Sequence, residues 1–167
     1  MKHKTQKQQQ VFTTFSVKQT KLLGAVLAKE LLKTPLRKHA VVFGLQGVLG
    51  SGKTSFVQGF AKGLGIKEKI LSPTFVIMKS YPFRRSEARP AKRGGKLQRF
   101  YHIDCYRIKD EQDLLSLGWD KIVSDPQNLV LIEWPERIQK ILPKDTISIS
   151  FETIKASKAH KRKITFS

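Results

Sequence analysis

A glycine-rich run that ends in a lysine and a threonine is the segment best suited to chemistry. Residues 47–54 read G-V-L-G-S-G-K-T and satisfy the pattern G-x-x-x-x-G-K-[ST]. Glycines let successive backbone N–H groups turn inward around an anion, at the positive end of the helix that follows. Lys53 would reach the β- and γ-phosphates, and the Thr54 hydroxyl would bind Mg²⁺. The run therefore predicts a nucleoside triphosphate site, and an ordinary glycine-rich turn is the alternative.

Two acidic residues stand at the ends of predicted strands, where such a site needs acids beside its metal. Asp104 follows the strand predicted over 99–103, and Glu133 ends the apolar run 129–132. An acid at the carboxyl end of a buried strand can bind Mg²⁺ or orient a water molecule. A solvated acid at a strand end is the alternative for each. We expect Lys53, Asp104 and Glu133 to be the catalytic residues, with Thr54 on the metal and either acid able to bind the metal or to orient water.

Two further side chains near these acids leave both a structural and a functional interpretation open. His102 lies two residues before Asp104, and a histidine at a strand end is more often a structural hydrogen-bonding residue than a catalyst. Trp134 follows Glu133 and is either a core residue or an aromatic that faces a partner.

The elements that must position these residues alternate between strand and helix. Ser16 and Gln19 resemble a capping box at the start of a helix that ends near Pro35. Further elements are expected as a strand at 40–45, a helix at 53–64, strands at 75–81 and 99–105, a helix at 110–117, a strand at 129–132, a short helix at 135–141, and strands at 146–152 and 163–166. This order predicts an α/β fold, a P-loop NTPase-like sandwich whose mixed, mainly parallel central sheet is flanked by helices.

The chain has 167 residues, 32 Lys and Arg against 13 Asp and Glu, and a formal net charge of +19. We expect a flexible basic tail at 1–10 and a single domain at 11–167 that carries a basic inserted loop at 82–99. The acids concentrate in residues 104–152, and we expect them to gather around the metal site. Cys105 is the only cysteine, which excludes an intramolecular disulfide framework. No apolar run is long enough to cross a bilayer and the first ten residues lack a signal sequence, so we expect a cytoplasmic protein.

Four motifs in a fixed order together resemble the TsaE (YjeE) family, the ATPase component of bacterial tRNA threonylcarbamoyladenosine biosynthesis. They are G-x-L-G-S-G-K-T-S from residue 47, S-P-T-F at 72–75, H-I-D-C-Y-R at 102–107 and I-E-W-P-E-R at 132–137. The resemblance extends from about Ser16 to Pro143, and weakly through 162–164. It implies a compact fold that binds ATP with Mg²⁺ and hydrolyses it slowly unless joined by the TsaD and TsaB proteins. Hydrolysis would then support turnover of the TsaB–TsaD complex.

Carried onto this sequence, the resemblance implies a set of nucleotide contacts around the glycine-rich run. Thr54 and Glu133 would hold Mg²⁺, and Asp104 would be an essential acid near the γ-phosphate. Thr74 belongs to a switch-like loop at 72–75, and Trp134 is the family's functional aromatic. The nucleotide-binding residues are expected to be Thr20, Leu49, Gly50, Ser51, Gly52, Lys53, Thr54, Ser55, Thr74, Trp134 and Arg162.

The sequence departs from the family pattern at two places. Val48 stands where the family usually has Asp, which removes a carboxylate beside the phosphates. The segment 82–99 is longer and more basic than the family's usual connector, and we expect it to contact tRNA or an acidic partner. Two other functions stay open from the residues alone. One is a small-molecule or nucleoside kinase that uses the Arg-rich 82–99 segment as a lid. The other is a nucleic-acid-binding module with a vestigial ATP site.

Overall fold

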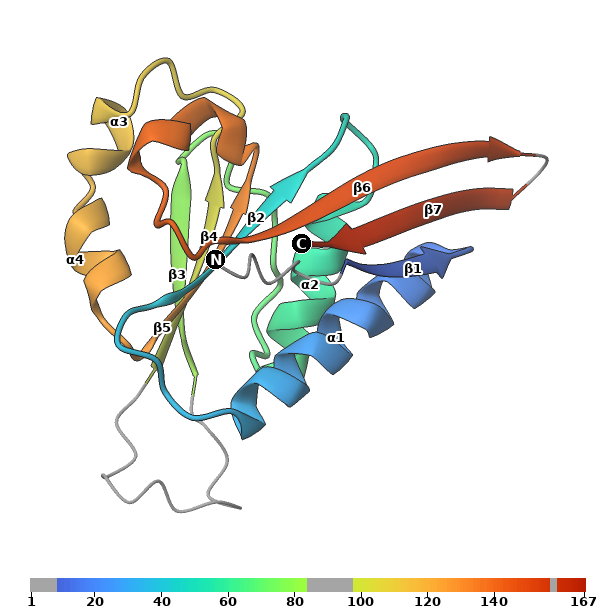
Figure 1. Cartoon of the computed structure of the whole chain (residues 1–167), viewed down its shortest axis with the longest axis horizontal. Coiled ribbons are helices and arrows are strands. Elements are labelled where there is room, and N and C mark those ends of the chain that lie inside the picture. Colours follow the sequence, from blue (N-terminus) through green and yellow to red (C-terminus); the bar gives the residue numbers. More distant parts are fainter. Residues whose placement is uncertain (1–8, 84–97, 157–158) are drawn as a thin grey trace, which may run out of the picture.

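The structure is a computed structural model that describes residues 9–83, 98–156 and 159–167. A seven-stranded sheet runs through it (Figure 1). The strand order is β1-β7-β6-β2-β5-β4-β3. The strands are β1 (Gln10–Thr14), β2 (Val41–Gln46), β3 (Met78–Phe83), β4 (Gln98–Asp104), β5 (Asn128–Glu133), β6 (Ile147–Ala156) and β7 (Ala159–Phe166).

The centre of the sheet is parallel and its two margins are antiparallel. β2 pairs in parallel with β5 and β6, and β5 pairs in parallel with β4. The pairs β1–β7, β6–β7 and β3–β4 are antiparallel. The predicted mixed sheet with a mainly parallel centre is therefore confirmed. Parallel pairing brings the carboxyl ends of β2, β4 and β5 to one edge of the sheet.

Helices cover both faces of the sheet and enclose two separate apolar cores. On one face, α1 (Val17–Lys33) packs on α2 (Lys53–Gly63), whose Phe60 lies against Phe43 of β2 and whose Phe56 lies against Phe151 of β6. On the other face lie α3 (Gln112–Leu115), α4 (Trp119–Ser124) and the 3₁₀ helix η1 (Pro135–Ile141). There Trp119 and Ile138 are buried with sheet residues such as Ile132. Two covered faces explain why β5 is buried along its whole length and why its residues 129–132 are apolar.

The first helix begins as its sequence predicts. The Ser16 hydroxyl accepts a hydrogen bond of 3.1 Å from the Gln19 N–H, while Gln19 Oε1 accepts one of 2.6 Å from the Phe15 N–H. The helix ends at Lys33, two residues before Pro35, because the residue that precedes a proline disfavours helical backbone. The beginning and end of α1 are therefore confirmed.

The strand predicted at 75–81 is shifted, and β3 begins only at Met78. Ile77 has φ +61°, outside the extended region, and the hydroxyls of Ser72 and Thr74 are tied to Asp104 instead. At its other end β3 includes Pro82 and Phe83, because an edge strand tolerates a residue without an N–H.

Other elements were either missed or predicted with the wrong extent. The strand β1 was not predicted, since its five residues are stabilised by pairing with the distant β7 and by the edge-to-face contact of Phe12 with Phe166. The helix predicted at 110–117 is only the short α3, and α4 begins after Gly118, whose φ of +83° turns the chain. The hairpin of β6 and β7 is longer at its turn end than predicted.

The basic segment predicted as a loop at 82–99 has both of its ends in strands. Phe83 of β3 pairs with Gln98 of β4, and residues 84–97 lie outside the described residues. The predicted tail at 1–10 lies mostly outside them as well. Gln98 is the first residue of β4, which runs parallel to β2 and β5. Phe83 and Gln98, the two residues that anchor the basic segment, therefore lie at the amino-end edge of the sheet. Of the described helices, none combines the length and apolar character that crossing a bilayer requires.

Contact between α1 and α2 depends on glycines at the crossing. A Cβ atom placed on Gly59 would lie 1.9 Å from the Lys21 carbonyl oxygen, and one on Gly24 would lie 2.3 Å from that of Phe56. The two backbones therefore touch where a larger residue would force them apart.

We predict that Gly59→Ala destabilises the fold by about 3 kcal/mol, because the methyl group has no room and must separate the helices. Alanine is the better helix former by about 1 kcal/mol, so a loss cannot come from helix propensity. Urea unfolding followed by circular dichroism measures the change. The control Lys62→Ala, on the exposed side of the same helix, should stay within about 0.5 kcal/mol of the parent. Equal stability of Gly59→Ala and the parent would contradict the close crossing.

Candidate functional site

A cavity of about 500 Å³ lies at the carboxyl-end edge of the parallel strands, where the loop after β2 meets the ends of β4 and β5. Asp104 and Glu133 are the last residues of β4 and β5, and they are opposite one another in the parallel register. The cavity is lined by Val17, Leu49, Gly50, Gly52, Lys53, Thr54, Ser55, Ser72, Thr74, Asp104, Tyr106, Glu133, Trp134 and Arg162.

The glycine-rich loop that borders the cavity needs its glycines for backbone conformation. Gly47, Gly50 and Gly52 have φ angles of +141°, +77° and +108°, a region that residues with a Cβ rarely adopt. A Cβ on Gly52 would also lie 3.0 Å from Nε of Arg162, a side chain that β7 brings to this loop. Helix α2 starts at the next residue, so its N-terminal N–H groups and positive dipole end face the cavity.

Lys53 lies in the wall of this cavity with its ammonium group held by the loop. Its Nζ donates hydrogen bonds to the carbonyl oxygens of Gly47 (2.6 Å) and Val48 (3.1 Å). The same atom lies 4.1 Å from the centre of the Trp134 ring. Burial lowers the pKa of Lys53, and the negative charges of Glu133, Glu136 and Asp104 partly oppose that shift. A bound anion would therefore be met by a desolvated cation, whose attraction is stronger than in water.

The Glu133 carboxylate is held by two donors from different elements. Thr54 Oγ1, in the first turn of α2, donates to Oε1 at 2.9 Å and to Oε2 at 3.1 Å. Nε2 of His102, on β4, lies 2.9 Å from Oε1. His102 and Glu133 are both buried. The histidine left open by the sequence is therefore hydrogen-bonded directly to a predicted site acid.

The second acid, Asp104, anchors the segment between α2 and β3. Its Oδ2 accepts hydrogen bonds from Ser72 Oγ (2.6 Å) and Thr74 Oγ1 (2.5 Å), and its Oδ1 accepts one from the Tyr106 N–H (3.0 Å). Phe75, in the same segment, is 82 % exposed beside the cavity, with the Arg107 guanidinium 4.2 Å from its ring centre. A change at Asp104 would therefore be felt directly by the loop that carries Phe75.

Trp134 has a left-handed backbone, with φ +61° and ψ +50°. For a bulky residue this conformation costs about 1–3 kcal/mol, which the rest of the structure must offset. The Trp134 N–H donates to the Leu45 carbonyl oxygen at 3.2 Å, and its ring lies 5.2 Å from that of Tyr106. The strained turn places Trp134 in the cavity wall, where the partly buried side chain also packs against the apolar core of that face.

The oxygen donors of the cavity fit Mg²⁺ better than a transition metal. Thr54, Asp104 and Glu133 supply hydroxyl and carboxylate oxygens, and the described part of the chain holds no group of three or more His, Cys, Asp and Glu residues that would form a metal centre. Magnesium binds in this way, through one or two protein oxygens together with substrate phosphates and water.

The structure brings most of the predicted site residues together at this cavity. Thr20 and Ser51 do not line it, and their predicted nucleotide contacts stay predictions. Thr20 is buried instead, with its hydroxyl 2.9 Å from that of Thr14. Val17 also lines the cavity, a place that no sequence pattern predicted; its position just after the Ser16 N-cap was the available signal.

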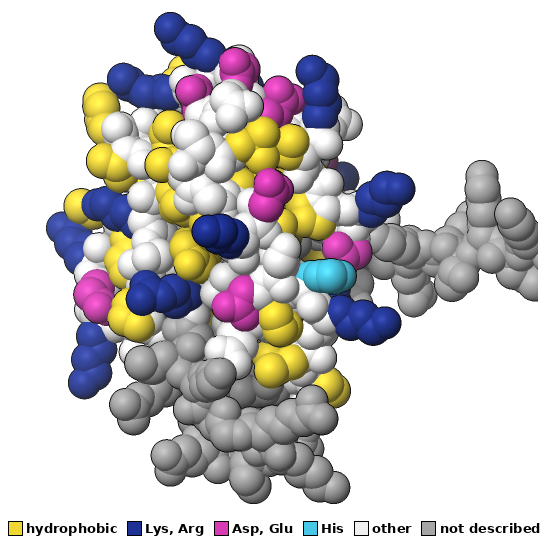
Figure 2. Space-filling view, turned by 90° about the vertical axis from the view of Figure 1, so that its left-hand side faces the viewer, with side chains coloured by type: hydrophobic (Ala, Val, Ile, Leu, Met, Phe, Trp, Pro, Cys, Tyr) yellow, Lys and Arg dark blue, Asp and Glu magenta, His cyan; other side chains and the backbone are white. Residues whose placement is uncertain are grey.

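The acids of residues 104–152 do not all gather at this cavity, contrary to expectation. Of those acids, Asp104 and Glu133 line it. Others, such as Asp113 and Asp120, are exposed on α3 and α4. Figure 2 shows that face, where acidic side chains lie interspersed with Lys and Arg. Most of the acidic stretch is therefore ordinary solvated surface.

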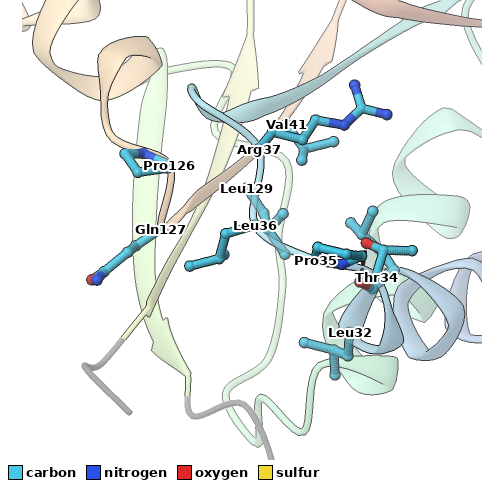
Figure 3. Close-up of a pocket in the computed structure, with 10 residues that line it drawn as sticks. Leu32, Thr34, Pro35, Leu36, Arg37, Val41, Pro126, Gln127 and Leu129 are labelled. Atoms are coloured by element: carbon cyan, nitrogen blue, oxygen red, sulfur yellow. Dashed lines mark hydrogen bonds between the residues drawn. The ribbon is translucent and has the colours of Figure 1, made fainter. Parts of the chain in front are cut away.

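A second hollow lies at the other edge of the sheet and is far smaller, about 30 Å³ (Figure 3). It lies between the end of α1 and the turn before β5, with a mainly apolar lining that includes Leu36, Val41 and Leu129. Arg37 is its one charged lining residue, so the larger cavity is the candidate site.

The fold and the cavity are those of a P-loop protein: a parallel strand, the glycine-rich loop and a helix, with two acids on neighbouring strands. A family model described as "Threonylcarbamoyl adenosine biosynthesis protein TsaE" matches residues 14–164. The chain belongs to the TsaE family.

Relatives and a solved structure agree with this assignment. The chain is 38 % identical over 135 residues to the "tRNA threonylcarbamoyladenosine biosynthesis protein TsaE" of Bacillus subtilis, covering 81 % of this chain and 74 % of the relative. It is 37 % identical over 119 residues to the protein of the same name from Treponema pallidum, covering 71 % and 78 %. The crystal structure of Bacillus subtilis YdiB superposes with a TM-score of 0.68 at 30 % identity, covering 95 % of this chain and 84 % of that one.

Cys105 follows Asp104 directly, at the carboxyl-end edge of the sheet, and its burial shows that solvent does not reach this part of the edge. The side chain is fully buried, and desolvation together with the negative charges of Asp104 and Glu136 raises the pKa of its thiol to about 12. The pKa is thus above the ordinary value of 9.0. Below pH 9 the thiol is protonated in both the folded and the unfolded chain, so it does not change the free energy of unfolding with pH. As the pH rises above 9, the unfolded thiol ionises first and stability is lost.

We predict that Cys105 reacts with Ellman's reagent at pH 8 about a thousand-fold more slowly in the folded protein than in urea, because the thiolate fraction falls with the raised pKa. Absorbance at 412 nm follows the reaction, and Cys105→Ser provides the blank. Comparable rates in both conditions would show that this edge opens freely.

Proposed function

We propose that this chain is a magnesium-dependent ATP-binding protein that hydrolyses ATP in tRNA threonylcarbamoyladenosine biosynthesis, the process named for its relatives. The observation that carries the proposal is the convergence of Lys53, Thr54, Asp104 and Glu133 on one cavity at the N-terminus of α2. The loop N–H groups and Lys53 bind the triphosphate, and the Trp134 ring contacts the Lys53 ammonium group through a cation–π interaction.

Each of the four side chains at the cavity has a separate role in the proposed hydrolysis. Thr54 and Glu133 hold Mg²⁺, which when bound neutralises charge on the phosphates. Lys53 stabilises the negative charge of the transferring group. The Asp104 carboxylate lies across the register from Glu133 and accepts a hydrogen bond from the attacking water.

Slow hydrolysis by the chain alone follows from the way its acids are occupied. Asp104 accepts three hydrogen bonds from its own chain, two of them at Oδ2, so a rearrangement of the Ser72–Thr74 segment would free that oxygen for water. We propose that the TsaD and TsaB proteins promote this rearrangement. Leu49 and Phe75 beside the cavity are 79 % and 82 % exposed, which suits a surface that a protein partner covers.

The kinase alternative is less well supported. A lid made by the basic segment would have to cover the cavity at the carboxyl edge, but its anchors Phe83 and Gln98 lie at the amino edge. The seven residues of β4 separate the two edges by about 20 Å at 3.3 Å per residue.

We predict that Lys53→Ala and Glu133→Gln each lower ATP turnover at least ~100-fold, because the first removes phosphate binding and the second weakens the metal site. Phosphate release is measured with and without the cognate TsaD and TsaB proteins. The matched controls Lys62→Ala and Glu152→Gln, which change the same residue types away from the cavity, should retain the parent rate.

Parent-like turnover by Glu133→Gln would move the metal role to Asp104. Transfer of phosphate to an acceptor faster than its release would favour a kinase.

We also propose that the basic segment contacts the tRNA backbone, on the basis of its sequence composition. Changing Arg84, Arg85, Arg93 and Lys96 together to Ser should weaken tRNA association about 10-fold or more at low salt and flatten its salt dependence. ATP turnover should be unchanged, since the segment is anchored at the opposite edge. Filter binding over a salt series measures the effect, and an unchanged affinity across it would reduce the segment to solvated surface.

A further inference from the structure

The function proposed for the cavity does not account for His102. This side chain is fully buried and belongs to β4, two residues before Asp104. Residues two apart on a strand share a face, and residues paired in parallel register share one too. His102, Asp104 and Glu133 therefore all point to the face covered by α2, the helix that carries Thr54.

The hydrogen bonding of His102 is one-sided. Nε2 lies 2.9 Å from Glu133 Oε1, whereas Nδ1 is buried without a hydrogen-bond partner among the described residues. Since a carboxylate oxygen accepts, we assign the proton to Nε2, which leaves Nδ1 as a bare acceptor. A buried acceptor without a partner is a smaller penalty than a buried N–H without one.

Thr54 alone does not fix the orientation of the Glu133 carboxylate. Its hydroxyl contacts both oxygens at nearly equal distances, 2.9 and 3.1 Å, so it does not distinguish one from the other. His102 contacts Oε1 alone. The histidine thereby distinguishes the two oxygens and leaves Oε2 as the one with room for a further ligand.

We propose that His102 is a positioning residue for Mg²⁺: its Nε2–H holds Glu133 Oε1 so that the carboxylate presents a defined oxygen beside Thr54. This inference rests on the magnesium–nucleotide site proposed above and assigns a role to a residue outside the cavity lining. Residues that orient metal ligands in this way typically contribute 10–100-fold to metal affinity.

The test compares two amide replacements in the full chain. His102→Gln keeps an N–H donor close to the position of Nε2, whereas His102→Asn is one methylene shorter and falls short of Glu133. Affinity for a non-hydrolysable ATP analogue is measured in EDTA and over a Mg²⁺ series, together with the thermal midpoint. Tyr101→Phe is the matched control, because its side chain packs in the core on the opposite face of the same strand.

We expect His102→Asn to require 10–100-fold more Mg²⁺ for half-maximal nucleotide binding, with affinity in EDTA within about two-fold of the parent. His102→Gln and Tyr101→Phe should stay within about three-fold of the parent Mg²⁺ requirement. A parent-like Mg²⁺ requirement in His102→Asn would overturn the inference, as would equal defects in both amide variants or failure of both to fold. Absence of any Mg²⁺ dependence in the parent would instead contradict the proposed magnesium site itself.

Discussion

Parallel pairing of β5 with β2 on one side and β4 on the other is the constraint on which the site depends. It brings the glycine-rich loop, Glu133 and Asp104 to one edge of the sheet, although they are distant in sequence. Each strand is apolar enough to be buried between two helical layers, so the register is set by packing. A shift of one residue in β5 would turn Glu133 to the other face and disconnect it from Thr54.

The remaining elements hold this edge together from several directions. The glycine contacts of α1 and α2 set the position of the helix that carries Thr54, and β7 brings Arg162 to the loop from the far end of the chain. The backbone strain at Trp134 lies directly after Glu133, where it places an aromatic ring beside Lys53. Strain of this kind is typical of functional positions, since stability alone would not select it.

Sequence patterns within a few residues predicted those segments whose conformation depends on neighbouring residues alone. The loop at 47–54, the Ser16 cap and the strand ends at Asp104 and Glu133 follow from glycine, capping and apolar patterns. The late start of β3, the strand β1 and the role of His102 depend on partners distant in sequence. Thr20 also has a partner distant from local patterns: its hydroxyl is bonded to Thr14 in β1, a strand that no local signal revealed, while its nucleotide contact stays a prediction.

The most direct test of the account is a crystal structure of the chain with Mg²⁺ and a non-hydrolysable ATP analogue. We predict that the β- and γ-phosphates lie on the N–H groups of residues 49–54 and on Lys53, with the cation on the Thr54 oxygen beside Glu133. A nucleotide bound elsewhere, or a cation held away from both Thr54 and Glu133, would contradict the account.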